Sequence, residues 1–379
     1  MALSKIDVAN MLTGLVPNDN TIRRPNAKPI IINGSMDVSQ RATSTSSITS
    51  DGFHTLDRFE THISSLGTWT QSQDTDVPSG QGFANSLKMD VTSADASPSA
   101  GDYCVIRTKF EGQDLQLFKK GTSSAEKFTL AFWVKSSKTG THIVELFDID
   151  NTRTVSQAYT ISSADTWEKK VVNFPADTTG AFGDDNERSL DIQFWLGAGS
   201  NFTSGTLQTT WAGQTNANRI VGQVNLADNT SNNWYITGVQ LEVGEFSSTT
   251  IPPFQHESFG DNLRRCERYY YFHCSESKNS DADTTIAFGS YYNSTTFSFA
   301  INTPCEMRAE PTLKQNTGSN MYRIYRNNGN ETLSSFSLDS RGTNKILTAT
   351  ATASGGTGGQ IGEIQTMDGT AFVAYDAEL

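Results

Sequence analysis

The sequence predicts an all-β protein with two domains, and three observations lead to this prediction. The chain has 379 residues, which is long for one hydrophobic core and sufficient for two. Charged residues make up only 18% and hydrophobic residues 36%, both below ordinary globular usage, so uncharged polar residues and glycine fill the gap. Short apolar runs alternate with polar residues between turn residues, a pattern typical of antiparallel sandwiches.

Residues 1–29 differ from the rest and are expected to form a short N-terminal helical arm that anchors the chain to another protein. Ser4 can cap a helix that ends near Gly14, and three prolines then favour an extended tether. Four basic and two acidic side chains give this segment a charge of +2, whereas the whole chain carries −12. We expect the arm to dock on an acidic partner; the alternative is a frayed terminus. The expected anchoring residues are Ile6, Met11, Leu12, Arg23 and Arg24.

Residues 30–258 are predicted to form the first β-sandwich. Ile30–Ile32 is expected to be a strand that enters a hairpin turn at Asn33 and Gly34. Eight further strands are expected at Asp57–Ile63, Leu87–Val91, Tyr103–Phe110, Phe128–Val134, Thr141–Phe147, Trp167–Phe174, Leu190–Leu196 and Trp234–Val243. Trp133 and Trp195 lie in alternating strands and are expected to be core residues.

A short helix and a second β-domain are predicted after the sandwich. Ser258 can cap a linker helix over residues 259–267, in which Leu263 and Cys266 share one face. Residues 268–379 then return to short strands and are expected to form a smaller C-terminal sandwich.

Composition excludes several classes of protein. The acidic balance and the lack of a long Lys/Arg run argue against nucleic-acid binding. No apolar run approaches the length of a membrane span, and Met1–Asn10 lacks the apolar centre of a secretory signal. The four cysteines have no metal-binding spacing and are expected to be reduced thiols of a protein made in a cytoplasm.

The sequence contains no recognisable catalytic motif. A nucleophile elbow, an H-E-x-x-H pair and a Walker loop are all missing from the sequence, and its five histidines lie far apart. We therefore expect neither an enzyme nor a cofactor. Asp148 with Asp150, and Asp184 with Asp185, offer oxygen ligands that would suit a structural calcium ion. The alternative is a pair of solvated turns whose side chains cap their own backbone.

Aromatic residues provide the other candidate site. Trp69 and Trp211 have polar neighbours in the sequence, so each is a candidate platform for the apolar face of a sugar ring. Tyr291 and Tyr292 form a comparable pair in the second domain. These four residues are the carbohydrate-binding candidates.

Several stretches, taken together, resemble a family of tailed-bacteriophage virion proteins, the tail fibres and related receptor-binding proteins. The first stretch contains Asn33, Gly34, Met36, Asp37, Gln40 and Arg41, followed by Asp57, Arg58 and Phe59. Central segments 128–137, 194–200 and 234–244 are similar to the family's sandwich strands, and 253–270 continues the signature. Segments 306–312 and 376–379 fit as well, so the resemblance spans residues 30–379.

The resemblance implies a galactose-binding-like jelly roll for the first domain, a shape often used to bind carbohydrate. It implies a β-sandwich or knob for the second domain, a homotrimer, and attachment to the virion through the N-terminal arm. The sequence departs from long-shafted fibres because it has no collagen-like or coiled-coil stretch.

These observations give one leading hypothesis and two alternatives. The leading hypothesis is a short tail fibre or receptor-binding protein, exposed on the particle, that attaches it to host surface polysaccharide. The first alternative is a head-fibre, decoration or cement protein of the capsid or tail. The second is a glycan depolymerase, although such enzymes are usually larger β-helices.

Overall fold

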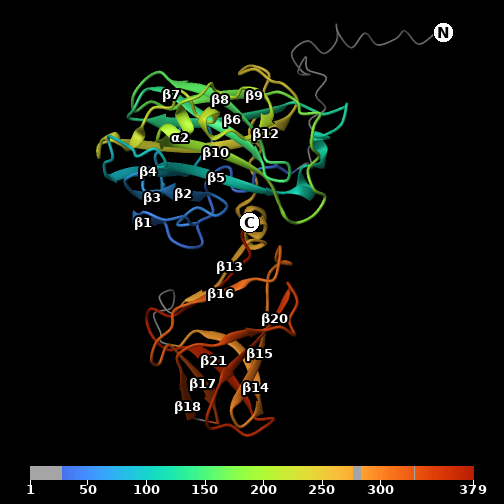
Figure 1. The fold of residues 1–379 in the computed structure, drawn as a ribbon. Helices are drawn as coiled ribbons and strands as arrows, with labels where there is room; N and C mark the ends of the chain where they lie inside the picture. The colour runs from blue at the N-terminus through green and yellow to red at the C-terminus, as the bar shows by residue number, and fades with distance from the viewer. Residues whose placement is uncertain (1–27, 276–282, 328) are drawn as a thin grey trace, which may run out of the picture.

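The computed structural model describes residues 28–275, 283–327 and 329–379. Figure 1 shows two β-rich bodies, one above the other, joined near helix α3 (Phe259–Glu267), with the C-terminus close to the junction. The predicted helical arm lies outside the described residues, as do Ile6, Met11, Leu12, Arg23 and Arg24. Within the described part of the chain, no helix is long and apolar enough to cross a membrane.

The first domain is a jelly roll of two antiparallel sheets. The order of one sheet is β1-β3-β4-β12-β6-β9 and that of the other is β11-β8-β7-β10-β5-β2. Strands β4 to β10 with β12 cross between the sheets in the order of two Greek keys, which defines a jelly roll. The predicted all-β fold class is therefore confirmed.

The elements of this domain have the following bounds. The strands are β1 (Ser44–Ile48), β2 (Glu60–Ser64), β3 (Thr68–Asp74), β4 (Ser86–Ser93), β5 (Tyr103–Glu111), β6 (Phe128–Ser136), β7 (Gly140–Asp148), β8 (Arg153–Ile161), β9 (Glu168–Phe174), β10 (Arg188–Ala198), β11 (Ala212–Gly213) and β12 (Asn233–Val243). Its helical segments are α2 (Ser200–Thr203) and the 3₁₀ turns Gly112–Asp114, Gln116–Phe118, Asn216–Asn218 and Leu226–Asp228.

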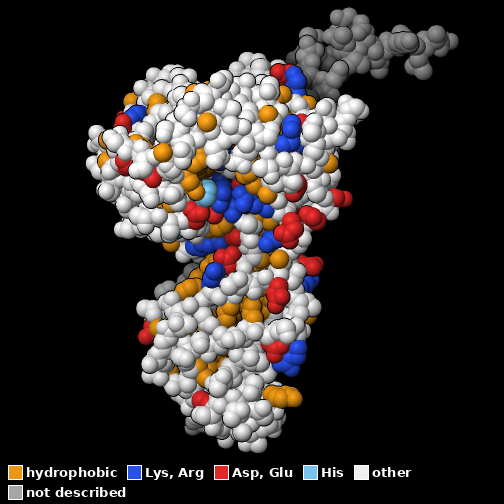
Figure 2. All heavy atoms as spheres, viewed as in Figure 1, with side chains coloured by type: hydrophobic (Ala, Val, Ile, Leu, Met, Phe, Trp, Pro, Cys, Tyr) orange, Lys and Arg blue, Asp and Glu red, His pale blue; other side chains and the backbone are white. Residues whose placement is uncertain are grey.

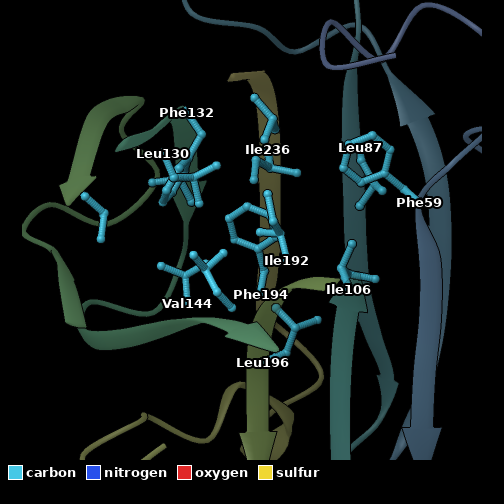
Figure 3. Packing of buried hydrophobic residues seen from close by; sticks show 14 of the residues in the cluster. Phe59, Leu87, Ile106, Leu130, Phe132, Val144, Ile192, Phe194, Leu196 and Ile236 are labelled. Atoms are coloured by element: carbon cyan, nitrogen blue, oxygen red, sulfur yellow. The ribbon is translucent and has the colours of Figure 1, made fainter. Parts of the chain in front are cut away.

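The core of the jelly roll comes from alternate residues of strands in both sheets. Leu130 and Phe132 of β6 face Val144 of β7 and Phe194 of β10, and all four side chains are fully buried (Figure 3). Phe132 and Phe194 pack edge to face with ring centroids 5.1 Å apart. Each such buried side chain contributes about 1.5–3 kcal/mol of transfer free energy relative to exposure, so this alternation accounts for the sandwich.

The predicted strand and hairpin at residues 30–34 are wrong. Residues 32–35 form a turn in which Asn33 has a φ of 59°, and the Gly34 carbonyl accepts a hydrogen bond from the Val239 amide at 2.9 Å. The side-chain amide of Asn33 donates to the backbone carbonyls of Val38 and Asp57 at 2.9 and 3.0 Å. This segment bonds to residues distant in the sequence, so no second strand pairs with it locally.

Helix α3 follows the jelly roll. The hydroxyl of Ser258 accepts a hydrogen bond from the Asp261 amide at 3.2 Å and caps the helix. Cys266 and Asn262 are buried on one face of the helix, and the Asn262 side-chain oxygen accepts from the Asn33 amide at 3.1 Å.

The second domain is a smaller antiparallel sandwich with its own core. Its sheets have the orders β13-β22-β16 and β18-β17-β21-β14-β15-β20-β19. The strands are β13 (Tyr270–Ser275), β14 (Thr285–Asn293), β15 (Thr296–Asn302), β16 (Thr312–Gln315), β17 (Tyr322–Arg326), β18 (Gly329–Leu333), β19 (Ser337–Asp339), β20 (Ile346–Thr352), β21 (Ile361–Thr366) and β22 (Phe372–Asp376). Phe297, Tyr322 and Tyr375 are among the fully buried residues of this second core.

A polar junction joins the two domains. The guanidinium of Arg58, which is buried, forms an ion pair with Glu378 and stacks 3.4 Å from the centroid of the Tyr269 ring. On the other side, Arg268 donates two hydrogen bonds to Glu111 at 2.7 Å, and the Tyr269 hydroxyl donates to the same carboxylate at 2.5 Å. Charged pairs with several hydrogen bonds hold geometry more strictly than apolar contact does, so these residues orient the domains.

Candidate functional site

The structure places both candidate tryptophans inside the first domain. Trp69 lies in β3 and is fully buried, and its indole N–H donates to the Leu66 carbonyl at 2.7 Å. Trp211 is only 8% exposed, and its indole N–H donates to the Pro175 carbonyl at 2.9 Å. Neither ring is available to stack on a sugar, so the platform prediction for these residues is wrong.

The two candidate tyrosines have opposite environments because neighbouring strand residues point to opposite faces. Tyr291 is 1% exposed, and its hydroxyl donates to Glu331 at 2.7 Å. Its predicted role as a sugar platform is therefore wrong. Tyr292 is 74% exposed on the outer surface of the second domain.

A lysine takes the place predicted for calcium at Asp148. The buried ammonium of Lys120 lies 2.5 Å from Asp148 Oδ2 and 3.0 Å from Asp177 Oδ2. It also donates to the carbonyls of Thr179 and Gly180 at 3.1 and 2.7 Å. Two carboxylates and two carbonyls thus surround an internal cation, which leaves no position for a metal at Asp148.

The other calcium candidates form turn contacts. Asp150 accepts from the Gly183 amide at 2.8 Å, and Asp185 accepts from the Glu187 amide at 3.0 Å. Asp184 is exposed next to them. No group of three or more His, Cys, Asp or Glu side chains in the described residues has the geometry of a metal site. The calcium prediction is therefore wrong at Asp148, where Lys120 lies, and the contacts of Asp150 and Asp185 agree with the alternative of turns.

A different group of side chains comes together on the outer face of the sheet that contains β5, β10 and β7. Glu60, Arg107 and Gln193 occupy successive register positions on β2, β5 and β10, and Glu145 follows on β7. Two residues further along the strands, Lys109 of β5 is the register partner of Asp191 of β10. We call this set the charged face; its members are Glu60, Arg107, Lys109, Glu145, Asp191 and Gln193.

The charges of this face are paired by short contacts. Arg107 Nε donates to Glu60 Oε2 at 2.6 Å, and Lys109 Nζ lies 2.8 Å from the same oxygen. Burial alone would raise the pKa of Glu60, but the hydrogen bonds and charges of Arg107 and Lys109 outweigh it and hold that pKa below its usual value. Burial, together with the neighbouring Arg107 charge, lowers the pKa of Lys109. Glu60 is therefore an ionised acceptor held in one orientation.

An arginine from the long loop after β10 completes the charged face. Arg219 donates to both oxygens of Glu145 at 2.7 to 3.1 Å and to the Gln193 side-chain oxygen at 3.1 Å. Its guanidinium lies 4.8 Å from the ring centroid of Trp195. Trp195 is buried as predicted, but in a satellite cluster on the outside of the sheet with Phe202. The other predicted core tryptophan, Trp133, is only partly buried.

Two partly exposed rings stand at the rim of the charged face. His62 and Tyr103 are packed with their ring centroids 4.8 Å apart, and His62 Nδ1 lies 2.7 Å from Asp51. Burial and the nearby Arg107 lower the pKa of His62, against the opposing effect of Asp51. Figure 2 shows basic, acidic, histidine and apolar side chains gathered in a hollow of the first domain that opens toward the junction.

The charged face was missed in the sequence because its members come from four separate strands. A signal does exist in single strands: Arg107 and Lys109 of β5, and Asp191 and Gln193 of β10, alternate with core residues. Charged residues at every second position of otherwise apolar strands indicate a second, polar face. Only the register of the sheet shows that these positions are neighbours.

Comparison with known proteins gives distant structural similarity. No protein-family model and no curated protein matches the chain. The enzymatically active domain of tailspike protein 4 from bacteriophage CBA120 is similar at 16% identity, with 57% of this chain and 21% of that chain covered and a TM-score of 0.31. This chain thus matches about a fifth of the tailspike chain.

Two other solved structures are similar to about half of this chain. A putative sugar-binding protein from Bacteroides thetaiotaomicron is 14% identical, with 57% of this chain and 100% of that chain covered and a TM-score of 0.30. The second is a family 11 carbohydrate-binding module from Clostridium thermocellum in complex with a β-1,3-1,4-mixed-linked tetrasaccharide. It is 11% identical, with 54% of this chain and 97% of that chain covered and a TM-score of 0.25. At these identities and TM-scores the matches do not bear on the ligand or activity of this chain.

Proposed function

We propose that this chain is a structural protein of a tailed-phage virion that binds host surface polysaccharide through the charged face of its jelly roll. The observation that carries the binding proposal is the set of hydrogen-bonding side chains held in fixed orientations beside the His62 and Tyr103 rings. The virion role rests on the sequence motifs that resemble phage fibre proteins.

The chemistry of the charged face suits a polyhydroxylated ligand. Arg107 and Arg219 have planar guanidinium groups whose geometry is held by Glu60 and Glu145. Both arginines are almost buried, at 9% and 8% exposure, so they hold the face in shape, and contacts with a sugar are expected at the partly exposed His62 and Tyr103. The Tyr103 ring at the rim supplies an apolar surface on which the C–H face of a sugar can stack.

The same electrostatics favour binding over cleavage. Hydrolysis of a glycosidic bond needs a carboxylic acid that keeps its proton near neutral pH, which requires a raised pKa. Glu60 has the opposite property, because Arg107 and Lys109 lower its pKa. A role in attachment without catalysis therefore agrees best with this carboxylate.

A binding experiment with rim variants tests the proposal. The full chain is titrated against purified capsular polysaccharide or lipopolysaccharide of the host in a calorimeter. Tyr103→Ala and His62→Ala should each weaken binding about tenfold, the equivalent of roughly 1.4 kcal/mol of lost stacking and hydrogen bonding. Thermal unfolding of each variant verifies that the jelly roll is intact.

Tyr292→Ala is the matched control because that tyrosine is exposed on the other domain. It should bind the polysaccharide as the wild type does. Unchanged binding in both rim variants, or loss of binding in Tyr292→Ala alone, would contradict the assignment to the charged face.

A further inference from the structure

We propose that the rim of the charged face selects sugars without an acidic group, and that the carboxylate of Asp51 makes this selection. The inference rests on the proposed function, because it names the class of sugar that the same site would take. Asp51 lies between β1 and β2, beside the two rings at which contact with the polysaccharide is expected. We call Asp51, His62 and Tyr103 the rim group.

Two hydrogen bonds hold the carboxylate of Asp51 in one orientation. Its Oδ1 accepts from the backbone amide of Ile63 at 2.8 Å, and its Oδ2 lies 2.7 Å from Nδ1 of His62. The neighbouring backbone is fixed as well, because Gly52 and Thr61 exchange amide-to-carbonyl hydrogen bonds at 3.0 and 2.9 Å. A side chain that is already held loses little conformational entropy when a ligand binds, so Asp51 is a preorganised acceptor.

Asp51 is a carboxylate that a ligand can reach, unlike the carboxylates inside the charged face. Its side chain is 47% exposed, whereas the side chains of Glu60 and Glu145 are 8% and 0% exposed. An ionised carboxylate has about four acceptor positions, and the two bonds described above use two of them. The others can accept hydrogen bonds from the hydroxyls of a sugar that lies against the rings.

Arg107, the cation next to His62, is already paired with a carboxylate. The register partner of His62 is Val105, and Arg107 follows two residues later on the same face of β5. Its guanidinium donates to Glu60 at 2.6 Å, and both side chains are almost buried. The charge of Arg107 is therefore compensated within the protein and is not offered to an acidic sugar.

Arg219, the cation next to Tyr103, is paired in the same way. Trp195 packs against both side chains, with its ring centroid 6.2 Å from that of Tyr103 and 4.8 Å from the guanidinium of Arg219. Arg219 donates to the fully buried carboxylate of Glu145 at 2.7 Å. The exposed charge beside the rings is therefore that of Asp51.

His62 adds little positive charge at neutral pH. Burial and the charge of Arg107 lower the pKa of His62 from 6.5, against the opposing effect of Asp51, so the imidazole is mostly neutral at pH 7. A neutral ring that donates from Nδ1 to Asp51 has an acceptor at Nε2. The rim group therefore presents acceptors, which suit the hydroxyl protons of a sugar.

These groups distinguish a hydroxyl from an acidic substituent. A hydroxyl donates its proton to a carboxylate in a charge-assisted hydrogen bond, which is stronger than a hydrogen bond between neutral groups. A sugar carboxylate has no proton to donate at neutral pH and would place a second negative charge beside Asp51. Binding sites reject competitors by such unpaired charges and repulsive contacts, so the rim favours sugars without an acidic group.

Two chemical forms of one polysaccharide test this selection. Polysaccharide isolated from the host surface is either reduced at its carboxyl groups or oxidised at its primary hydroxyls to carboxylates. Both forms are titrated against the full chain in a calorimeter. The wild type should bind the reduced form about tenfold or more tightly than the oxidised form.

Asp51→Asn should weaken binding of the reduced form about tenfold, because a charge-assisted hydrogen bond becomes a neutral one. It also removes the repelling charge, so the preference for the reduced form should shrink to less than about threefold. The variant retains an oxygen for the Ile63 amide, so the jelly roll should stay folded, which thermal unfolding verifies.

Asp368→Asn is the matched control, because it removes the same charge on the second domain, where Asp368 accepts from the Thr370 amide at 2.8 Å. It should keep the wild-type affinity for both forms. Equal affinity of the wild type for the two forms, or unchanged affinities in Asp51→Asn, would overturn the selection.

Tyr103→Ala separates this inference from the proposed function. If Tyr103→Ala weakens binding of the reduced form and Asp51→Asn does not, the polysaccharide binds at the rim and only the selection by Asp51 is wrong. If Tyr103→Ala binds the reduced form as the wild type does, the site itself is wrong, and the selection is wrong with it.

Discussion

At the scale of single residues, Lys120 shows how the protein stabilises a region for which the sequence suggested calcium. Its ammonium lies among Asp148, Asp177 and two backbone carbonyls and is fully buried. The acidic residues were recognised in the sequence, but their cation comes from a lysine 28 positions away from Asp148, and no spacing rule links them.

Lys120→Met should strongly destabilise the first domain. It leaves the buried carboxylate of Asp148 without the ammonium that it contacts, which costs about 3–5 kcal/mol, whereas Asp177 keeps its ion pair with Arg153. Urea unfolding measures the loss. Lys119→Met is the control: Lys119 forms an exposed ion pair with Glu126, and its loss should cost less than about 1 kcal/mol. Equal losses in the two variants would contradict the structural role of Lys120.

Asp57 should make stability depend on pH. Burial raises its pKa from 3.8 to about 7, against the opposing effects of Arg41 and Gln40. Between these two pH values the folded chain holds a proton that the unfolded chain has lost, so the free energy of unfolding should fall as pH rises from about 4 to about 7.

Asp57→Asn should remove this part of the pH dependence, on the order of a few kcal/mol across the interval. Urea unfolding of both proteins at pH 5 and pH 8 measures it, and taking the difference cancels the contributions of other titrating groups. Parallel changes in wild type and variant would show that Asp57 ionises normally.

At the scale of elements, alternation predicted the sandwich strands well. Core positions such as Leu130 and Phe132 are two residues apart, so the two-residue period of a strand is visible in the sequence. The same rule explains the error at Trp69: Gln71, two residues on, is also buried, where it accepts a hydrogen bond from the Thr55 hydroxyl at 2.7 Å. Polar neighbours therefore did not indicate an exposed strand.

The hairpin prediction at Asn33 was wrong for a different reason. A local hairpin needs a neighbouring strand, whereas Asn33 bonds to Asp57 and to Asn262, which is 229 positions away. Sequence propensity does not report such long-range partners. The charged face was hidden in the same way, because Glu60 and Glu145 become neighbours only through the sheet.

Asn33→Ala should therefore destabilise the first domain by about 3 kcal/mol or more. The change removes hydrogen bonds to Val38 and Asp57 and places a residue with a Cβ but no polar group at a φ of 59°. Asn33→Gly retains the backbone freedom and isolates the hydrogen bonds. Thermal unfolding that is unchanged in both variants would contradict the anchoring role of this side chain.

At the scale of the whole molecule, a polar junction joins the two domains, each of which has its own core. The charged face lies beside this junction on the first domain, where Lys109 also donates to the carbonyl of Leu379. A homotrimer of the kind that the family resemblance implies would place three charged faces on one assembly. Multivalent attachment of this kind strengthens binding to a repeating polysaccharide without any new contact.

The N-terminal arm is proposed to attach this assembly to the virion. Removal of residues 1–27 retains Pro29, whose carbonyl accepts a hydrogen bond from Arg265 at 2.6 Å, so the remaining chain should unfold at the same temperature as the full chain. The truncated protein should be missing from purified particles when it replaces the wild type during infection. Normal incorporation into particles would contradict the anchoring role.

The central claim is that the charged face binds polysaccharide, and a crystal structure of the full chain with an oligosaccharide of the host surface tests it most directly. The account predicts density for a sugar beside the His62 and Tyr103 rings at the rim of the charged face. A sugar bound to the second domain, or anywhere else outside the rim of the charged face, would contradict it.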